Sequence, residues 1–339
     1  MGWERFVTIL TAKCIDLHAH VRLAATDGAA GPHGPEQGTD ENGQTWYRVG
    51  NYKILGVKHK NSPFTDPDLR IQRMDSAHID FQVVSPSPLT YFHYIDAKSA
   101  IAFCRKFNDA LAALVRRYPG RLAGFASLPM QAPDAAAEEL ERAVCELGLW
   151  GAATGTEFAG EPLHSPAFDK LYDTFVRLDV PLCLHPAPAG IDGPPGDPAL
   201  KRFDLDVIVG FAAQETIAVA TLIFGGVMER HPKLDIWISH GGGSAVFSAA
   251  RLAQAGRKRP WATASMKKDG AFETMLRRFW FDAHLNDDLA LQLLVDKVGI
   301  DRVVFGTNFA GWDQPEDGQH GVVRPEFADN ARRFLRKTA

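Results

Sequence analysis

The stretch that decides the fold is Ile15-Asp16-Leu17-His18-Ala19-His20, a short apolar run that ends in two histidines. In an extended strand, side chains at positions i and i+2 point to the same face. His18 and His20 are therefore predicted to project together from one face of a strand. A single histidine at a strand end is more often a structural residue than a metal ligand. The pair therefore indicates a metal site only if other strands also end in histidine.

Seven further apolar runs follow this strand, and helix-length amphipathic segments separate them. Strands that are buried on both faces read as continuous apolar runs. Eight strands that alternate with helices favour a closed α/β barrel over an open doubly wound sheet. The later runs span residues 83–86, 122–128, 151–156, 181–185, 235–239, 279–282 and 303–305. We predict one (β/α)8 TIM barrel domain that comprises the whole chain, residues 1–339.

Two segments interrupt this alternation, and both follow the C-terminal ends of strands, where barrel active sites are built. Residues 21–63, after strand one, are rich in Gly, Asn and charged residues and are predicted to be an inserted loop. Residues 187–198, after strand five, carry Gly and Pro throughout. Each segment is equally well explained as a cover over the site or as an ordinary surface loop.

Composition is that of an ordinary globular protein, with 339 residues of which 45% are hydrophobic and 23% charged. A formal net charge of −4 predicts no attraction to nucleic acid or to an anionic membrane. No apolar run reaches the roughly 18 residues of a membrane span, and the N-terminus lacks the pattern of a signal peptide. The four cysteines are scattered, which predicts reduced thiols in a cytoplasmic protein.

Two more histidines close predicted strands, His185 on the fifth and His240 on the sixth. In a closed barrel, the four histidines of these three strands meet at one mouth. Neutral imidazole is a common ligand of divalent cations such as Zn. Three protein ligands with one open position form the usual catalytic arrangement. The sequence therefore predicts a metal site at this mouth. The glycines that follow, residues 241–243, lack the lysine and spacing of a phosphate-binding loop and are expected to let the backbone turn tightly.

The chain resembles the amidohydrolase-related family that includes 2-amino-3-carboxymuconate-6-semialdehyde decarboxylase. Other members are resorcylate-type and carboxyvanillate decarboxylases, oxalomesaconate hydratase and a hydrolase of meta-cleavage products. The resemblance covers nearly the whole chain, and it is carried by residues 16–20, 184–186, 238–242, 304–308 and 330–334.

This resemblance implies a (β/α)8 barrel, one divalent metal ion that is usually Zn and sometimes Mn, and a homodimer. It also implies that His18, His20 and His185 are the metal ligands. His240 is then the residue that carries protons as acid or base.

Asn308 departs from the family pattern, because most relatives carry Asp at this position and the hydratases carry Glu. An Asn side chain offers only a neutral carbonyl oxygen as acceptor and cannot act as a base. Asn308 is then either a weak ligand or a group that orients a water at the metal. Alternatively, a nearby carboxylate supplies the missing charge, or the chain is a variant with damaged activity. The nearby carboxylates are Asp282, Glu157 and Asp313.

Further residues are predicted to bind the substrate. His93, in the run 88–93 after strand two, is expected to face it, and Asp282 closes the seventh strand. Basic residues in or beside the first insertion are candidates for clamping a carboxylate, although a solvated charged loop explains each one equally well. These are Arg48, Lys58, Lys60 and Arg70.

The function expected from these features is that of a metal-dependent carbon–carbon lyase. The first choice is decarboxylation of an aromatic-derived or muconate-type carboxylic acid, with a metal as Lewis acid and His240 as acid or base. Hydrolysis or hydration of a ring-cleavage product is the alternative within enzymes. A non-catalytic barrel that binds a metal or a small carboxylate is the alternative of another class.

Overall fold

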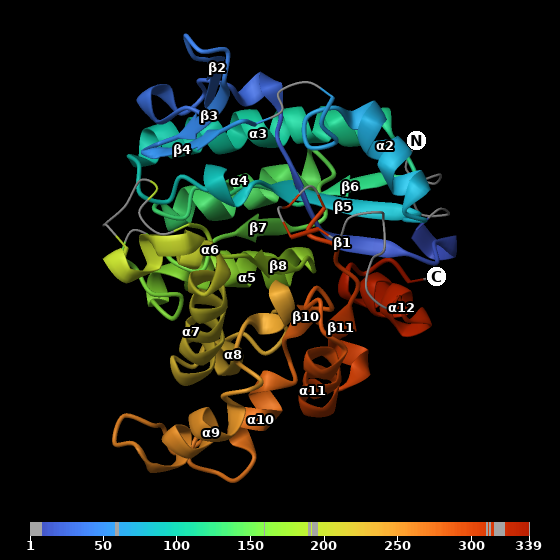
Figure 1. Ribbon diagram of the computed structural model, residues 1–339. Helices are drawn as coiled ribbons and strands as arrows, with labels where there is room; N and C mark the ends of the chain where they lie inside the picture. Colours follow the sequence, from blue (N-terminus) through green and yellow to red (C-terminus); the bar gives the residue numbers. More distant parts are fainter. Residues whose placement is uncertain are drawn as a thin grey trace.

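The computed structural model describes residues 9–338 except 58–60, 159, 189–190, 192–195, 310, 312 and 315–322. Within these residues, eight parallel strands form the centre of the molecule (Figure 1). They are β1 (Ile15–Val21), β5 (Phe81–Pro86), β6 (Leu122–Gly124), β7 (Ala152–Thr154), β8 (Leu182–Leu184), β9 (Ile236–Ile238), β10 (Trp280–Asp282) and β11 (Val303–Val304). Each lies within or nearly within a run predicted from the sequence.

The strands pair in the order β1-β5-β6 and β7-β8-β9-β10-β11, so each strand lies beside the next parallel strand of the chain. Single parallel bridges join the two sheets at both edges. Ala126 pairs with Ala152, and Ala19 pairs with Phe309. The expected α/β architecture of alternating parallel strands and helices is confirmed.

Helices connect the strands and pack around them (Figure 1). They are α2 (Pro67–Ser76), α3 (Ala97–Arg117), α4 (Pro133–Cys145), α5 (Asp169–Leu178), α6 (Leu205–Ile208), α7 (Gly210–Phe224), α8 (Val227–Arg230), α9 (Ala249–Lys258), α10 (Ala271–Leu276), α11 (Asp288–Val298) and α12 (Pro325–Phe334). No single helix in the described part of the chain is long and apolar enough to cross a membrane, and only the bent pair 198–208 with 210–224 passes that test when the two are combined.

Two hydrophobic clusters make up the core. The larger cluster lies between strands and helices, and the smaller one gathers Leu17, Phe125, Cys183 and Trp237 from the strands. The smaller cluster also includes Phe334 of α12 and side chains from the starts of β1 and β5. It therefore fills the N-terminal end of the strands and leaves their C-terminal ends, which carry the histidines, free to form a site.

The first insertion, expected as a loop, contains a three-stranded antiparallel sheet of β2 (Glu36–Thr39), β3 (Thr45–Val49) and β4 (Tyr52–Leu55). Two hairpin signals explain the difference. Asn42-Gly43 and Gly50-Asn51 flank a run of β-branched and aromatic residues. Gly38 has no side chain where Trp46 packs, since a Cβ there would lie 2.5 Å from the indole ring. Half of the second insertion, residues 187–198, lies outside the described residues.

A buried carboxylate ties the first strand to its neighbours. Asp16 accepts hydrogen bonds from the backbone N–H of His18 at 3.0 Å and from that of Thr307 at 3.1 Å. It also accepts from the Thr307 hydroxyl at 2.7 Å and from the Gln82 amide at 2.8 Å. The backbone of the metal-site strand is thereby fixed against β5 and the segment after β11.

Arg70 extends this network from α2. The side chain is 1% exposed, and its guanidinium donates to the Gln82 side-chain oxygen at 2.6 Å and to the backbone carbonyl of His20. It also packs over the Phe309 ring. The prediction that Arg70 clamps a substrate carboxylate is therefore wrong, because all of its contacts lie inside the protein.

Replacing Arg70 with methionine is expected to lower the free energy of unfolding by about 3 kcal/mol, because it breaks a buried, charge-assisted network. Urea denaturation measures this loss. Arg73→Met is the matched control, since Arg73 is exposed on the same helix. Equal stability of the two variants would contradict the structural role of Arg70.

Candidate functional site

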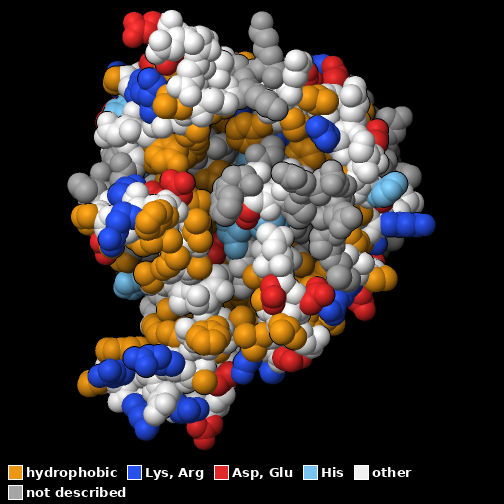
Figure 2. Space-filling model, in the orientation of Figure 1, with side chains coloured by type: hydrophobic (Ala, Val, Ile, Leu, Met, Phe, Trp, Pro, Cys, Tyr) orange, Lys and Arg blue, Asp and Glu red, His pale blue; other side chains and the backbone are white. Residues whose placement is uncertain are grey.

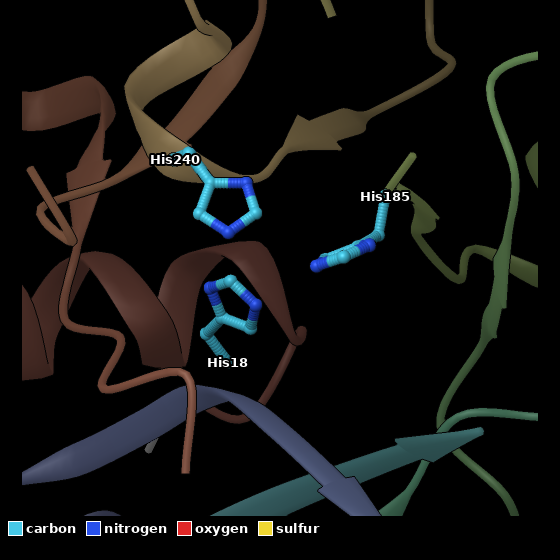
Figure 3. A group of neighbouring side chains, drawn as sticks. All are labelled: His18, His185 and His240. Carbon is cyan, nitrogen blue, oxygen red and sulfur yellow. The ribbon is translucent and has the colours of Figure 1, made fainter. Parts of the chain in front are cut away.

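Four histidine rings meet at the C-terminal ends of the parallel strands. His18 and His20 lie in β1, His185 directly follows β8, and His240 lies two residues beyond β9. The ring of His18 is centred 5.2 Å from that of His20 and 5.1 Å from that of His185. The ring of His240 lies 4.9 Å from those of both His18 and His185. Figure 3 shows His18, His185 and His240 pointing toward one another from separate elements.

The three histidines of β1 and β8 each donate Nδ1–H to a fixed acceptor. The acceptors are the Asp282 carboxylate for His18 at 2.7 Å, the Pro86 carbonyl for His20 at 3.2 Å, and the Pro186 carbonyl for His185 at 2.6 Å. A neutral ring that donates through Nδ1 carries its lone pair on Nε2. This is the partner arrangement that typically orients metal-binding histidines.

The Nε2 atoms of the same three histidines are buried and have no hydrogen-bond partner among the described residues. Burial lowers the pKa of His20 to about 3 and lowers the pKa values of His18 and His185 as well, so the rings are neutral. An unsatisfied buried polar atom costs roughly 1–3 kcal/mol. Three such nitrogens in one place fit a divalent metal ion, which accepts the lone pairs of neutral imidazoles.

His240 is held differently. Its Nδ1 lies 2.7 Å from Oε1 of Glu215, a fully buried carboxylate on α7 that also accepts from the Ser239 hydroxyl. Burial disfavours the charged ring, but the Glu215 charge and hydrogen bond outweigh it and raise the pKa of His240 to about 9. A doubly protonated ring has no lone pair for a metal but has a proton to give.

The distances between ligand atoms single out a set of three that differs from the expected one. The ligand atoms of His18, His185 and His240 lie within 4.8 Å of one another, whereas the expected set contains His20 in place of His240. The ring of His20 is 4.7 Å from that of His185, and its Nε2 is one of the unpartnered nitrogens. Because Glu215 keeps the proton on His240, we favour the set with His20.

The glycines after His240 allow the turn that places this ring. His240 itself has a positive φ of 45°. A Cβ on Gly242 would lie 2.6 Å from the Phe281 ring, and one on Gly243 would lie 2.2 Å from the carbonyl oxygen of Ala212. The tight backbone turn expected for these glycines therefore places His240 beside α7 and β10.

Asp282 and His93 do not face a substrate. Asp282 is fully buried, and besides His18 it accepts from the backbone N–H of Gly241 at 3.0 Å. It therefore orients the ring of His18 and is not free to bind a substrate. His93 donates from Nδ1 to the Glu157 carbonyl at 3.1 Å and accepts at Nε2 from a threonine hydroxyl at 2.9 Å. Both of its nitrogens are occupied by the protein.

The predicted cationic clamp is not found on Arg48. Its guanidinium donates to the Gly50 carbonyl at 2.7 Å and pairs with Glu36 at 2.8 Å, and it does not line the cavity at the histidines. Lys58 and Lys60 lie outside the described residues.

A cavity of about 560 Å³ opens onto the histidines. Figure 2 shows pale blue histidine side chains in a hollow near the middle of this face, bordered by apolar side chains. The first insertion reaches this cavity, because Tyr52 and Ile54 of β4 line it. Phe64, Leu89 and Phe211 supply further apolar wall. Ligand pockets commonly have volumes of about 300–1,000 Å³, so a small aromatic acid fits.

Asn308 lines the cavity, and its amide is held by a carboxylate of the same wall. Its Nδ2–H donates to Oδ1 of Asp313 at 2.6 Å, and the other oxygen of Asp313 accepts from Nε2 of His284 at 2.9 Å. The sequence-based list of carboxylates near Asn308 included Asp313, and the structure selects it as the direct partner.

Sequence reasoning missed two residues of the site. Glu215 is the single charged residue of the apolar segment 210–224, which is a signal of a buried functional or paired carboxylate. His284 is not among the candidate residues named from the sequence, yet it lines the cavity. It lies two positions after Asp282, the same spacing as between His18 and His20. This spacing at a strand end could have identified it as a candidate.

Comparisons with known proteins place the chain in one family. A family model described as Amidohydrolase matches residues 15–339. The chain is 31% identical over 244 residues to 2-amino-3-carboxymuconate-6-semialdehyde decarboxylase of Dictyostelium discoideum, a match that covers 72% of this chain and 66% of that protein, just under two thirds. It is 30% identical over 260 residues to gamma-resorcylate decarboxylase of Rhizobium radiobacter, covering 71% and 76% respectively.

Among solved structures, the fold is similar to that of dihydroxybenzoic acid decarboxylase from a Polaromonas species, which was solved with bound manganese and the inhibitor 2-nitroresorcinol. The TM-score is 0.72 at 22% identity, and the match covers 96% of this chain and 97% of the other. At this identity the likeness establishes the fold.

The protein purified without chelator is expected to contain about one divalent ion per chain, measured by elemental analysis. His20→Ala should lose it, since a three-nitrogen site loses one ligand. His240→Ala and the surface control His78→Ala should keep it. Loss of the ion from His240→Ala with retention in His20→Ala would assign the ligand role to His240 instead.

Proposed function

We propose that this chain, which belongs to the amidohydrolase family, is a metal-dependent decarboxylase of an aromatic-derived or muconate-type carboxylic acid. The observation that carries the proposal is the cluster of three buried, unpartnered Nε2 atoms beside the His240–Glu215 pair. The apolar cavity in front of this cluster has room for an aromatic acid. Two relatives that carry decarboxylase names support the choice of reaction.

His18, His20 and His185 are proposed to hold one divalent ion. Three imidazole nitrogens favour Zn, whereas the structurally similar Polaromonas decarboxylase was solved with manganese. When bound, the ion supplies a Lewis acid that polarises a substrate oxygen. The proposal also takes the eight parallel strands as one closed (β/α)8 barrel with insertions after β1 and β8. The bridges between Ala126 and Ala152 and between Ala19 and Phe309 support closure.

His240 is the proposed proton donor. Its Nδ1 is held by Glu215, and the ring lines the cavity, so Nε2–H is the proton available to the substrate. That proton passes to the ring carbon that carries the carboxylate. The bond from this carbon to the carboxylate then breaks, its electron pair restores the aromatic system, and CO2 leaves.

Hydration or hydrolysis of a ring-cleavage product is the second candidate, because Asn308 weakens the case for decarboxylation. The amide cannot take up a proton at the position where decarboxylases of the family carry Asp. The His240–Glu215 pair nevertheless supplies the proton that decarboxylation needs, which is why decarboxylation remains the first choice.

Release of CO2 from a panel of aromatic and muconate-type acids by the metal-loaded protein tests the function. His240→Ala should lower kcat by about 100-fold or more, the usual contribution of a general acid. His78→Ala, on the surface, should leave it unchanged. Addition of water to an unsaturated acid without any CO2 release would favour the second candidate.

Asn308→Asp is expected to lower turnover by roughly tenfold, because two carboxylates would then face each other where a 2.6 Å hydrogen bond now joins Asn308 to Asp313. Steady-state assays of the two proteins at equal metal content measure the change. A rise in turnover of about 100-fold would instead identify Asn308 as a disabling replacement.

A further inference from the structure

Asp313 brings a negative charge to the wall of the cavity. Its side chain is 20% exposed and lines the cavity, and both carboxylate oxygens have partners, Asn308 on one and His284 on the other. Burial opposes ionisation, but the His284 hydrogen bond and the nearby positive charges keep the pKa of Asp313 below its usual range. The Asp313 carboxylate is therefore negatively charged, and a ligand bound in the cavity lies against this charge.

A tight turn fixes the position of this carboxylate. Asn308 has a positive φ of 48°, a conformation that Asn tolerates better than most residues. The backbone N–H of Gly311 donates to the Asn308 carbonyl at 2.6 Å. A Cβ on Gly311 would lie 2.5 Å from the Asn308 side-chain amide, so a larger residue there would displace that amide. This turn allows the Asp313 carboxylate to accept the hydrogen bond from the Asn308 amide.

No Lys or Arg side chain lines the cavity among the residues that the structure describes. The other lining carboxylate, Glu215, is fully buried and already engaged by His240 and Ser239. Among the described lining residues, His240 at the base is the group held in its charged form, and the remaining wall is largely apolar. One carboxylate of a ligand can therefore be neutralised at the histidines, whereas a second one would lie in an apolar cavity that contains Asp313.

We infer that Asp313 is a specificity-determining residue that restricts the substrate to acids with a single carboxylate on a neutral, largely apolar body. The inference rests on the proposed function in one respect, namely that the first carboxylate binds at the histidine cluster. A neutral hydroxyl or amino group on the substrate can donate to Asp313, whereas a second carboxylate is repelled by it. Muconate-type diacids are then excluded, although a relative of this chain is named for such a substrate.

A matched pair of ligands tests this selection by binding rather than by turnover. 3-Nitrobenzoate and isophthalate have the same planar shape and differ by one negative charge. Isothermal titration of the metal-loaded protein should show at least about tenfold tighter binding of 3-nitrobenzoate, which is about 1.4 kcal/mol. Asp313→Asn, which keeps an acceptor for Asn308, should reduce this ratio to about threefold or less.

Two variants serve as controls for the charge. Asp313→Glu keeps the charge and should retain the preference. Asp173→Asn should leave the ratio unchanged, since Asp173 also pairs with a histidine, His231, but on α5 away from the cavity. Asp313→Ser, which also removes the charge, replaces Asp313→Asn if the latter does not melt cooperatively.

Equal binding of the two ligands by the unsubstituted protein, or an unchanged ratio in Asp313→Asn, would overturn the inference. Selective binding of 3-nitrobenzoate without release of CO2 from any acid would support the inference while contradicting the proposed decarboxylation. Failure of the metal-loaded protein to bind either ligand would overturn both.

Discussion

The four hydrogen bonds accepted by the buried carboxylate of Asp16 hold β1 in place. They connect β1 to β5 through Gln82 and to the segment after β11 through Thr307. The fixed backbone of β1 holds His18 and His20 in position with the precision of about 0.5 Å that a metal site needs. The site, the cavity and the proposed chemistry all depend on this fixed strand, because two of the three proposed ligands are carried by it.

Three histidine–carboxylate contacts surround the site, and each gives its histidine a different task. Asp282 is buried under His18 and leaves that ring neutral with its lone pair free. Glu215 is buried under His240 and keeps that ring protonated. Asp313 is partly exposed, pairs with His284 and presents its charge to the cavity. Burial and neighbouring charges thus separate the proposed roles in metal binding, proton transfer and substrate selection among residues of the same two types.

The sequence predicted the parallel strands and the four convergent histidines, because strand-end positions follow directly from the alternation of apolar runs and helices. It could not predict which polar residues near those ends turn inward. Arg48, Arg70 and His93 look like ligand-binding residues by type, but their partners are protein atoms that only the packed chain brings near. Glu215 escaped notice because its pairing with His240 joins two elements 25 residues apart. The sheet within residues 21–63 was not predicted, although Asn42-Gly43 and Gly50-Asn51 are recognisable hairpin-turn sequences.

The central claim is that three neutral imidazoles on β1 and β8 hold one metal ion while His240 stays outside the coordination shell. X-ray absorption at the zinc edge of the zinc-loaded protein tests this most directly. The account predicts scattering from three imidazole rings with zinc–nitrogen distances of about 2.0–2.1 Å, and the same spectrum with one ring fewer for His20→Ala. A spectrum that shows a single imidazole, or one that loses a ring on His240→Ala and not on His20→Ala, would contradict it.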